Sequence, residues 1–319
     1  MDKILKVKNL KTSFFTEDGE IEAVRGINFE VSKGEILGIV GESGSGKSIT
    51  SKSIMRIIQK PGKIISGELL FNDEDLMKKS DKEMRKVRGN EISMVFQDSM
   101  TALNPLLTVG KQIGEIITRH QDLNKKEARE KSIEMLKKVG IPSPETRIDN
   151  YPHEFSGGMR QRVCIAMAIS SNPKLLIADE PTTALDVTIQ AQILRLLKEL
   201  NMITGSSVML ITHDLGVVYN TCDRVIVMYG GRIMEEGTVK EIFENPKHPY
   251  TKGLLKSIPK ARCNKKERLV PIDGTPPNLL NPPSGCPFFN RCEYKIEKCS
   301  TKPSTTLINI NHKVDCWIY

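Results

Sequence analysis

The sequence predicts an α/β fold with a largely parallel sheet and a small antiparallel β subdomain near the N-terminus. Short apolar runs alternate along the chain with stretches of helical period, an order that is typical of parallel strands joined by helices. Residues 21–31 instead alternate apolar and polar side chains, as an antiparallel strand with one face on a core does. The runs expected to form the parallel strands are residues 35–40, 91–96, 174–179, 207–212 and 224–228.

The composition indicates a globular chain with an anionic partner. Hydrophobic residues make up 39% and charged residues 27% of the 319 residues, which is enough apolar material for a core. The net charge of +8 fits nucleic acid, nucleotide phosphate or the inner leaflet of a membrane, and charge alone does not choose among them. Apolar runs fall short of the roughly 20 residues needed to cross a bilayer. The N-terminus also lacks the apolar run of a secretory signal, so we expect a cytosolic protein.

Two departures from the alternation mark further parts of the chain. Residues from about 98 to 170 show helical periods without a good strand and are expected to form a helical subdomain. From about residue 245 the sequence becomes rich in Pro, Lys and Cys. We therefore expect a main domain over residues 1–245 and a small Cys-rich C-terminal extension over residues 246–319.

The strongest motif is a glycine-rich loop between a predicted strand and a predicted helix that runs to about residue 58. Residues 41–48 read GESGSGKS and fit the pattern G-x-x-x-x-G-K-[ST]. The glycines let backbone N–H groups curl around an anion at the positive end of the helix. Lys47 is expected to reach the β- and γ-phosphates of a nucleotide, and Ser48 to place its hydroxyl on Mg2+. The residues expected to bind this cofactor are Gly41, Ser43, Gly44, Ser45, Gly46, Lys47, Ser48 and Ile49.

Polar residues at three predicted strand ends supply candidate catalytic and Mg2+ groups. The run LLIADE ends in Asp179, expected to orient Mg2+ and its waters, and Glu180, expected to polarise an attacking water. Gln97 follows another strand and is expected to join the Mg2+ sphere. His213 follows a third and is expected to contact the γ-phosphate, although an isolated histidine at a strand end is usually structural.

A second anion site is predicted where the sequence FSGGMRQR begins a long helix. Ser156, Gly157 and Gly158 lie at the start of that helix. Because the chain carries no further ligand motif for this site, we expect a nucleotide held by a partner chain to bind there. The simpler alternative is a serine N-cap followed by flexible glycines.

Taken in order, these motifs resemble those of the ATP-binding subunits of ABC transporters. The resemblance covers about residues 4–240 and includes the family's D-loop, which ends at Asp186. It implies a P-loop ABC ATPase with a RecA-like core, and ATP and Mg2+ as cofactors. It also implies hydrolysis of ATP, with Glu180, His213 and Gln97 as the catalytic residues.

Two aromatic positions and one signature variant bear on how the nucleotide is bound. Phe14 falls where the family has an aromatic residue that stacks on adenine, with Phe15 as a competing choice and a core role open for either. The signature departs from the usual LSGGQ by having Phe155 for Leu and Met159 for Gln. Loss of the Gln amide removes a contact to the partner's nucleotide, whereas the Ser-Gly-Gly core is retained.

Residues 96–113 and 241–259 resemble the peptide and nickel branch of the family, and the FSGGM variant resembles its D-type ATPase subunit. This implies import of dipeptides or oligopeptides at the cytoplasmic face of the membrane. The implied partners are a second homologous ATPase subunit, two transmembrane permease subunits and an extracytoplasmic substrate-binding protein; the isolated subunit can also form a homodimer. Nickel import is the alternative within the branch. A soluble ABC ATPase acting on nucleic acid or ribosomes is the alternative from another class. The resemblance to peptide importers implies that the chain does not bind nucleic acid.

Four of the seven cysteines lie close together near the C-terminus, at Cys286, Cys292, Cys299 and Cys316. In a reducing compartment this clustering favours a metal site over disulfides, although the C-x2-C spacing of zinc sites is missing. The resembled extension can hold a [4Fe-4S] cluster, which we expect here. Zn2+ and free thiols or occasional disulfides remain alternatives.

Overall fold

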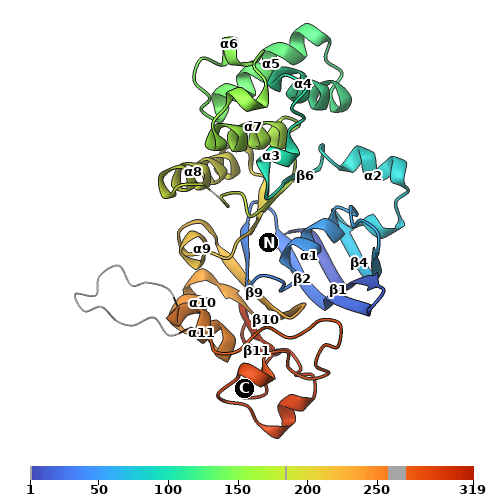
Figure 1. Ribbon diagram of the computed structural model, residues 1–319, viewed down its shortest axis with the longest axis vertical. Helices are drawn as coiled ribbons and strands as arrows, with labels where there is room; N and C mark the ends of the chain where they lie inside the picture. The colour runs from blue at the N-terminus through green and yellow to red at the C-terminus, as the bar shows by residue number, and fades with distance from the viewer. Residues whose placement is uncertain (1, 184, 258–270) are drawn as a thin grey trace, which may run out of the picture. The chain divides into compact units, whose positions relative to one another are not determined.

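The structure is a computed structural model that describes residues 2–183, 185–257 and 271–319 (Figure 1). The chain forms two compact units. The first unit consists of Met1–Ile4, Ser32–Glu35 and Leu76–Ile211, and the second consists of Leu5–Val31, Ile36–Asp75 and Thr212–Tyr319. Among the described residues, no helix has both the length and the apolarity that a bilayer crossing needs.

Three parallel strands form the sheet of the first unit. They are β6 (Ile92–Val95), β7 (Leu175–Asp179) and β8 (Ser207–Ile211), which lie side by side in that order. Every residue of β7 and β8 is buried, as expected for strands of a parallel sheet covered on both faces. The register pairs Asp179 with Ile211, so β7 ends level with β8.

The chain between β6 and β7 is helical, as its sequence pattern predicts. Val109, Ile113 and Ile117 form a fully buried stripe, and α4, α5 and α7 pack together (Figure 1). The side chain of Thr108 caps the start of α4 and that of Asn124 caps α5. The helical elements of this unit are η1 (Leu76–Lys78), α2 (Asp81–Val87), α3 (Ser99–Ala102), α4 (Val109–His120), α5 (Lys125–Lys138), α6 (Pro144–Arg147), η2 (Pro152–Glu154), α7 (Gly157–Ile169) and α8 (Val187–Thr204).

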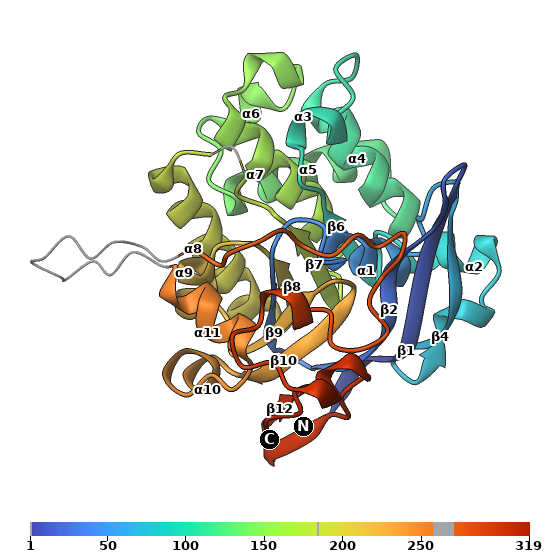
Figure 2. The same ribbon diagram turned by 60° about the horizontal axis from the view of Figure 1, so that its bottom comes forward.

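The predicted antiparallel β subdomain belongs to the second unit. Its strands lie in the order β2–β1–β4–β5, and β1 and β5 both run antiparallel to β4. Figure 2 shows β2, β1 and β4 side by side. The expected strand at residues 21–31 is part of β2. The strands are β1 (Lys3–Thr16), β2 (Gly19–Ser32), β4 (Gly62–Phe71) and β5 (Glu74–Asp75).

A second set of strands in this unit lies in the order β11–β12–β10–β9–β3. Within this set, β3 and β9 pair in parallel, and the other described pairs are antiparallel. The C-terminal extension contributes β12, which pairs with β10, and β11, which pairs with β12. The strands are β3 (Ile36–Val40), β9 (Arg224–Tyr229), β10 (Arg232–Thr238), β11 (Thr306–Asn309) and β12 (His312–Val314). The helices are α1 (Lys47–Ile54), α9 (Leu215–Thr221), α10 (Val239–Glu244), α11 (Pro249–Lys256), η3 (Phe289–Arg291) and η4 (Glu297–Ser300).

The helix after the glycine-rich loop is shorter than expected. It ends at Ile54 rather than near residue 58. The reason is local, because Arg56 adopts a left-handed backbone with a φ of 50°, which interrupts a right-handed helix.

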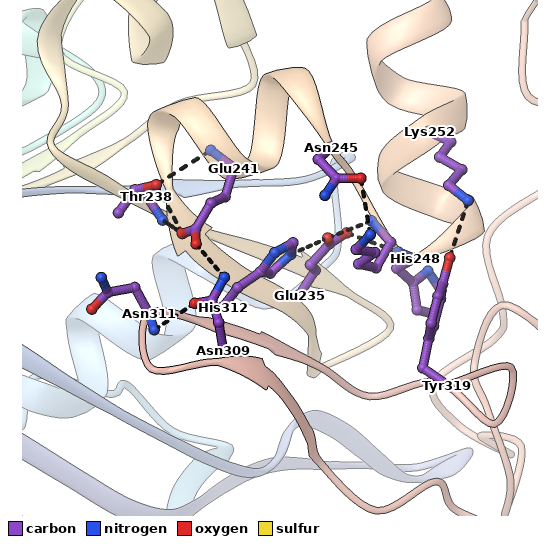
Figure 3. Close-up of polar contacts among 11 residues, drawn as sticks. Glu235, Thr238, Glu241, Asn245, His248, Lys252, Asn309, Asn311, His312 and Tyr319 are labelled. Carbon is purple, nitrogen blue, oxygen red and sulfur yellow. Dashed lines mark hydrogen bonds and ion pairs between the residues drawn. The ribbon is translucent and has the colours of Figure 1, made fainter.

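A buried carboxylate on β10 holds the C-terminal extension in place (Figure 3). Glu235 accepts hydrogen bonds from the backbone N–H groups of Lys247, at 2.6 Å, and His248, at 2.9 Å. Its Oε1 also lies 2.7 Å from Nε2 of His312 on β12. A buried polar or charged group is tolerated only when it has hydrogen-bonding partners of this kind. Through these contacts Glu235 connects β10 to residues 247–248 and to β12.

We expect His248 to make the protein acid-sensitive. Its Nδ1 accepts a hydrogen bond from the N–H of Tyr250 at 3.0 Å, and burial lowers its pKa to about 3. A histidine in the unfolded chain titrates near about 6.5, so stability is complete above that pH and is lost as the pH falls toward 3. His248→Asn keeps an acceptor without a titrating ring. Urea unfolding between about pH 6.5 and 4 should therefore show a shallower loss of unfolding free energy in this variant.

His153→Asn, at an exposed position, is the matched control for that series. The control should keep the slope of the wild-type protein. Equal slopes in the His248 variant and the wild type would show that the buried ring does not govern the acid response.

Candidate nucleotide-binding and catalytic site

The glycine-rich loop joins the buried strand β3 to helix α1. Gly44 and Gly46 have φ values of 76° and 99°, which L side chains rarely adopt. Gly46 takes the N-cap position of α1, and no side chain in the described part of the chain caps the helix there. Ser45 is buried and Ser43 is exposed, while Ser48 and Ile49 lie half-buried in the first turn. A helix start in this setting favours an anion, because N–H groups and the helix dipole point toward it.

Lys47 folds back over the loop. Its Nζ donates hydrogen bonds to the carbonyl oxygens of Gly41 and Glu42, both at 2.8 Å, and to Oγ of Ser45 at 3.2 Å. The residue is only 5% exposed, and these oxygens compensate the loss of water around its charge. The ammonium group therefore lies beside the backbone of the loop that is predicted to hold phosphates.

Two glycines of the loop are required by close backbone approach. A Cβ atom on Gly41 would lie 2.1 Å from the carbonyl oxygen of Met228, and one on Gly46 would lie 2.5 Å from that of Ala23. The N–H of Gly231 donates to the carbonyl oxygen of Ser45 at 3.1 Å. The loop is thus packed against backbone that side chains at 41 and 46 would displace.

In the first unit, the structure brings Gln97 and Glu180 together. Nε2 of Gln97 donates a hydrogen bond to Oε2 of Glu180 at 2.9 Å. Asp179, at the end of β7, is 3% exposed. Glu180 has a φ of 47°, a conformation that costs a non-glycine residue about 1 kcal/mol or more. Its N–H donates to the carbonyl oxygen of Ile211 at 2.9 Å, which fixes the residue in that conformation.

Thr183 is a contact of this site that the sequence reasoning missed. Its Oγ1 donates to Oε2 of Glu180 at 2.9 Å, the same oxygen that Gln97 contacts. The two residues also share a turn, in which the N–H of Thr183 donates to the carbonyl oxygen of Glu180. A hydroxyl residue three positions after a strand-end carboxylate is the signal that could have found it.

His213 belongs to the second unit, with Lys47 and Ser48, whereas Gln97 and Glu180 belong to the first. His213 is exposed and directly follows Thr212, whose N–H donates to the carbonyl oxygen of Ile39 at 3.2 Å. The predicted residues therefore form two sets, each held by the strands of its own unit.

The predicted second anion site lies at the start of α7. Ser156 is the N-cap, and its Oγ accepts from the N–H of Met159 at 3.3 Å. A Cβ atom on Gly158 would lie 2.6 Å from Cγ2 of Ile189. Asp186 caps α8 and accepts from the N–H of the same Ile189 at 2.9 Å. Gly158 of the signature and Asp186 of the D-loop therefore both contact Ile189 of α8. Ala184, where the predicted D-loop begins, lies outside the described residues.

The two candidate adenine contacts differ in exposure. Phe14 is half-buried on β1 opposite Gly62, where a Cβ atom would lie 2.6 Å from the Phe14 ring. Phe15 is 44% exposed, and Nζ of Lys63 lies 5.8 Å from its ring centroid. Both rings therefore lie near the end of β1, a strand that precedes the glycine-rich loop in the sequence.

The described structure does not show a formed metal site at the cysteines of the predicted iron–sulfur cluster. Cys286, Cys299 and Cys316 are buried, Cys292 is half-buried, and these four are free thiols. Burial raises the pKa of Cys286 to about 12 and also raises the pKa values of Cys292 and Cys316, with smaller contributions from neighbouring thiols. Burial therefore opposes the thiolate form that binds metals. Over the described ranges, no group of three or more His, Cys, Asp or Glu side chains has the arrangement of a metal site.

Comparison with known families identifies the class of protein. A family model described as ABC transporter matches residues 24–183, and one described as oligopeptide/dipeptide transporter, C-terminal region, matches residues 234–299. The chain belongs to the ABC transporter family as one of its ATP-binding proteins, and the expected ABC ATPase fold is confirmed.

Two relatives define its branch more closely. The chain is 56% identical to the dipeptide transport ATP-binding protein DppD of Bacillus subtilis strain 168, over 100% of this chain and 95% of that protein. It is 54% identical to the oligopeptide transport ATP-binding protein OppD of the same organism, over 99% and 89%. These names agree with the predicted D-type subunit.

Solved structures of ATP-binding cassettes share the fold. The dimeric cassette MJ0796 in a post-hydrolysis state with ADP and Pi matches with a TM-score of 0.67 and 31% identity, over 74% of this chain and 98% of that chain. CbiO1 of Clostridium perfringens matches with a TM-score of 0.65 and 33% identity, over 77% and 92%.

Alanine substitutions in the loop should separate steric from conformational requirements. In Gly41→Ala the new Cβ meets a backbone oxygen at 2.1 Å in addition to the strain of a φ of 153°, whereas in Gly44→Ala nothing lies within 4 Å and only the φ of 76° opposes alanine. We expect Gly44→Ala to lower the free energy of unfolding by about 1 kcal/mol and Gly41→Ala by about 3 kcal/mol or more. Thermal unfolding of both variants measures this order, and equal losses would contradict the packing described for Gly41.

Proposed function

We propose that this chain is the ATP-hydrolysing subunit that powers import of dipeptides or oligopeptides across the cytoplasmic membrane. The observation that carries the proposal is the occurrence in one chain of a hydrolytic motif set and a peptide-transporter C-terminal region. The relatives named as dipeptide and oligopeptide transport ATP-binding proteins support it over nearly the full length of the chain. The same C-terminal match argues against a role on nucleic acid or ribosomes.

Residues 41–48 bind the phosphates of ATP in this proposal. The N–H groups of the loop and the start of α1 face the anion, and Lys47 neutralises charge on the β- and γ-phosphates. Ser48, Asp179 and Gln97 are the residues that would bind Mg2+. Bound Mg2+ supplies charge neutralisation as the phosphoryl group is transferred. Phe14 or Phe15 stacks on the adenine.

Glu180 positions and polarises the attacking water. An ionised carboxylate only accepts hydrogen bonds, and donors from Gln97 and Thr183 occupy its Oε2, each at 2.9 Å. Those two contacts fix the carboxylate, which we assign to the water. In this proposal Gln97 joins the Mg2+ sphere while the γ-phosphate is present and relaxes when it leaves. His213 contacts the γ-phosphate.

The second anion site serves the nucleotide of a partner. We assign Ser156, Gly157, Gly158 and Asp186 to the ATP held by a second homologous ATPase subunit, in a heterodimer within the complex or a homodimer in isolation. The dimeric state of the related cassette MJ0796 supports this arrangement. Two permease subunits and an extracytoplasmic substrate-binding protein complete the importer, which places this chain at the cytoplasmic face of the membrane. In this scheme residues 1–245 hydrolyse ATP and residues 246–319 form the peptide-transporter extension.

The substrate is tested on the assembled complex. The complex is purified with its other subunits, these are identified, and it is reconstituted in lipid vesicles with the substrate-binding protein. ATP turnover that rises with dipeptides or longer peptides supports the proposal. A rise with Ni2+ instead would assign the chain to nickel import.

Glu180→Gln should abolish steady-state ATP hydrolysis while leaving ATP binding intact. The amide keeps the shape of the side chain but cannot accept a proton from water, so turnover is expected to fall by about 100-fold or more. Lys47→Ala is the contrasting variant, in which binding itself weakens because the phosphates lose their cation. Phosphate release and binding of a fluorescent ATP analogue separate the two. Normal turnover in Glu180→Gln would remove this residue from catalysis.

We also propose that Cys286, Cys292, Cys299 and Cys316 bind a [4Fe-4S] cluster. Support comes from the number and softness of these ligands. The thiols of Cys292, Cys299 and Cys316 also lie near enough to Cys286 to contribute to its raised pKa. Binding would require the thiols to rearrange, since their present positions do not form a metal site. Bound iron would convert buried thiols to stabilised thiolates and cross-link the extension.

Purification of the protein under anaerobic conditions tests this proposal. A brown sample with about four irons and an equal amount of acid-labile sulfide per chain is expected. Cys299→Ser should lose that iron. A colourless sample without iron would refute the cluster, and one zinc per chain would replace it with the alternative metal.

A further inference from the structure

We propose that Tyr250 and Arg291, in the C-terminal extension, are positioning residues that hold the phosphate-binding loop in its binding conformation. Neither belongs to a nucleotide-binding motif. Both contact Glu42, the second residue of the loop, and all three lie in the same compact unit. The inference deepens the proposed function and rests on the role assigned there to residues 41–48.

Tyr250 anchors the backbone of the loop. Its hydroxyl oxygen accepts a hydrogen bond from the N–H of Glu42 at 2.9 Å, and its side chain is fully buried on α11. The carbonyl oxygen of Glu42 accepts from Nζ of Lys47 at 2.8 Å. Both backbone groups of Glu42 are thus fixed, one by the extension and the other by the lysine that is expected to bind phosphate. Without the Tyr250 hydroxyl, the N–H would lose its protein partner in a partly buried setting.

Arg291 anchors the side chain of the same residue. Its Nη1 donates to Oε2 of Glu42 at 2.7 Å and to the hydroxyl of Tyr229 at 3.0 Å. The Arg291 side chain is only 7% exposed, so this ion pair is shielded from the solvent that weakens surface pairs. Its Nε and Nη2 donate to the carbonyl oxygens of Asp273 and Ile272, both at 2.9 Å. Arg291 therefore ties Glu42 to the body of the extension through one rigid guanidinium group.

An aromatic cluster fixes both anchors. The ring of Tyr250 lies 4.5 Å from that of Tyr229 and 5.3 Å from that of Phe288, measured between centroids. The guanidinium carbon of Arg291 lies 5.6 Å from the Tyr229 centroid and 5.9 Å from that of Phe288. Packing of this kind leaves the anchoring atoms little freedom to move away from Glu42.

The start of α11 is fixed in turn by the buried carboxylate of β10 (Figure 3). Glu235 accepts from the N–H groups of Lys247 and His248, the two residues directly before the helix that carries Tyr250. The same carboxylate contacts His312 near the end of the chain. A continuous set of contacts therefore runs from the last strand, through Glu235 and α11, to the loop.

A second point of contact supports the same role. The turn between β9 and β10 contains Gly230, where a Cβ atom would lie 2.9 Å from Pro287 of the extension. The next residue, Gly231, donates its N–H to the carbonyl oxygen of Ser45 in the loop at 3.1 Å. The extension thus bears on the loop both at Glu42 and, through this turn, at Ser45.

The consequence concerns nucleotide affinity. A loop that spends only part of its time in the binding conformation binds ATP more weakly in proportion to that fraction. Tyr250→Phe removes one oxygen and keeps the ring, and Arg291→Gln removes the charge. We expect each to raise the dissociation constant for Mg2+ and ATP about fivefold to tenfold, as the loss of a buried hydrogen bond does.

The experiment titrates the full-length chain and its variants with a fluorescent ATP analogue, well below the melting temperature of each. Tyr319→Phe is the matched control, since the Tyr319 hydroxyl contacts only a half-buried lysine, Lys252, among the contacts resolved for it. Its dissociation constant should match the wild type. Arg291→Lys should recover part of the affinity that Arg291→Gln loses. Glu42→Gln combined with Arg291→Gln should bind no more weakly than Arg291→Gln alone, because the two act as a pair.

Affinities of Tyr250→Phe and Arg291→Gln within twofold of the wild type would overturn the inference, as would losses that simply add in the double variant. Failure of the wild-type chain to bind ATP, or normal binding by Lys47→Ala, would instead contradict the role of the loop itself. The two outcomes are therefore distinguishable in one set of titrations.

Discussion

Close backbone packing around the glycine-rich loop is the constraint on which the rest of the structure depends. Gly41 and Gly46 lie against carbonyl oxygens of β9 and β2 at distances that exclude a side chain. That approach lets the loop turn tightly enough for Lys47 to fold back onto its own carbonyl groups. Because β2 and β9 are distant from the loop in the sequence, the shape of the loop depends on long-range packing. Elements that pack on these two strands therefore also influence the loop.

Much of the fold follows from local pattern, and the remainder depends on pairing between distant segments. The buried strands β7 and β8 and the apolar face of α4 are visible as apolar runs and a helical stripe. Strands β1 and β4 were not predicted, because their stability comes from a register that joins residues such as Leu5 and Phe71. The placement of β12 beside β10 is likewise a long-range pairing that neither strand signals alone.

The candidate site shows the same division. Spacing within short motifs identifies Lys47, Ser48, Asp179 and Glu180, because each motif lies at the end of one strand. Thr183 could have been recognised from its turn. Arg291 could not, since 249 residues separate it from Glu42 and only the folded chain brings their charges together. The cysteines are a converse case, in which a suggestive cluster in sequence is not matched by ligand geometry in the described chain.

Glu235 has a consequence for how such proteins evolve. Deletion of the segments that carry His248 and His312 would remove the groups that compensate the carboxylate of Glu235 and would uncover the edge of β10. We therefore expect truncation of the extension to destabilise the part of the cassette that carries β10. Exchange of extensions between related ATPases would require the histidine and the turn before α11 to be transferred together.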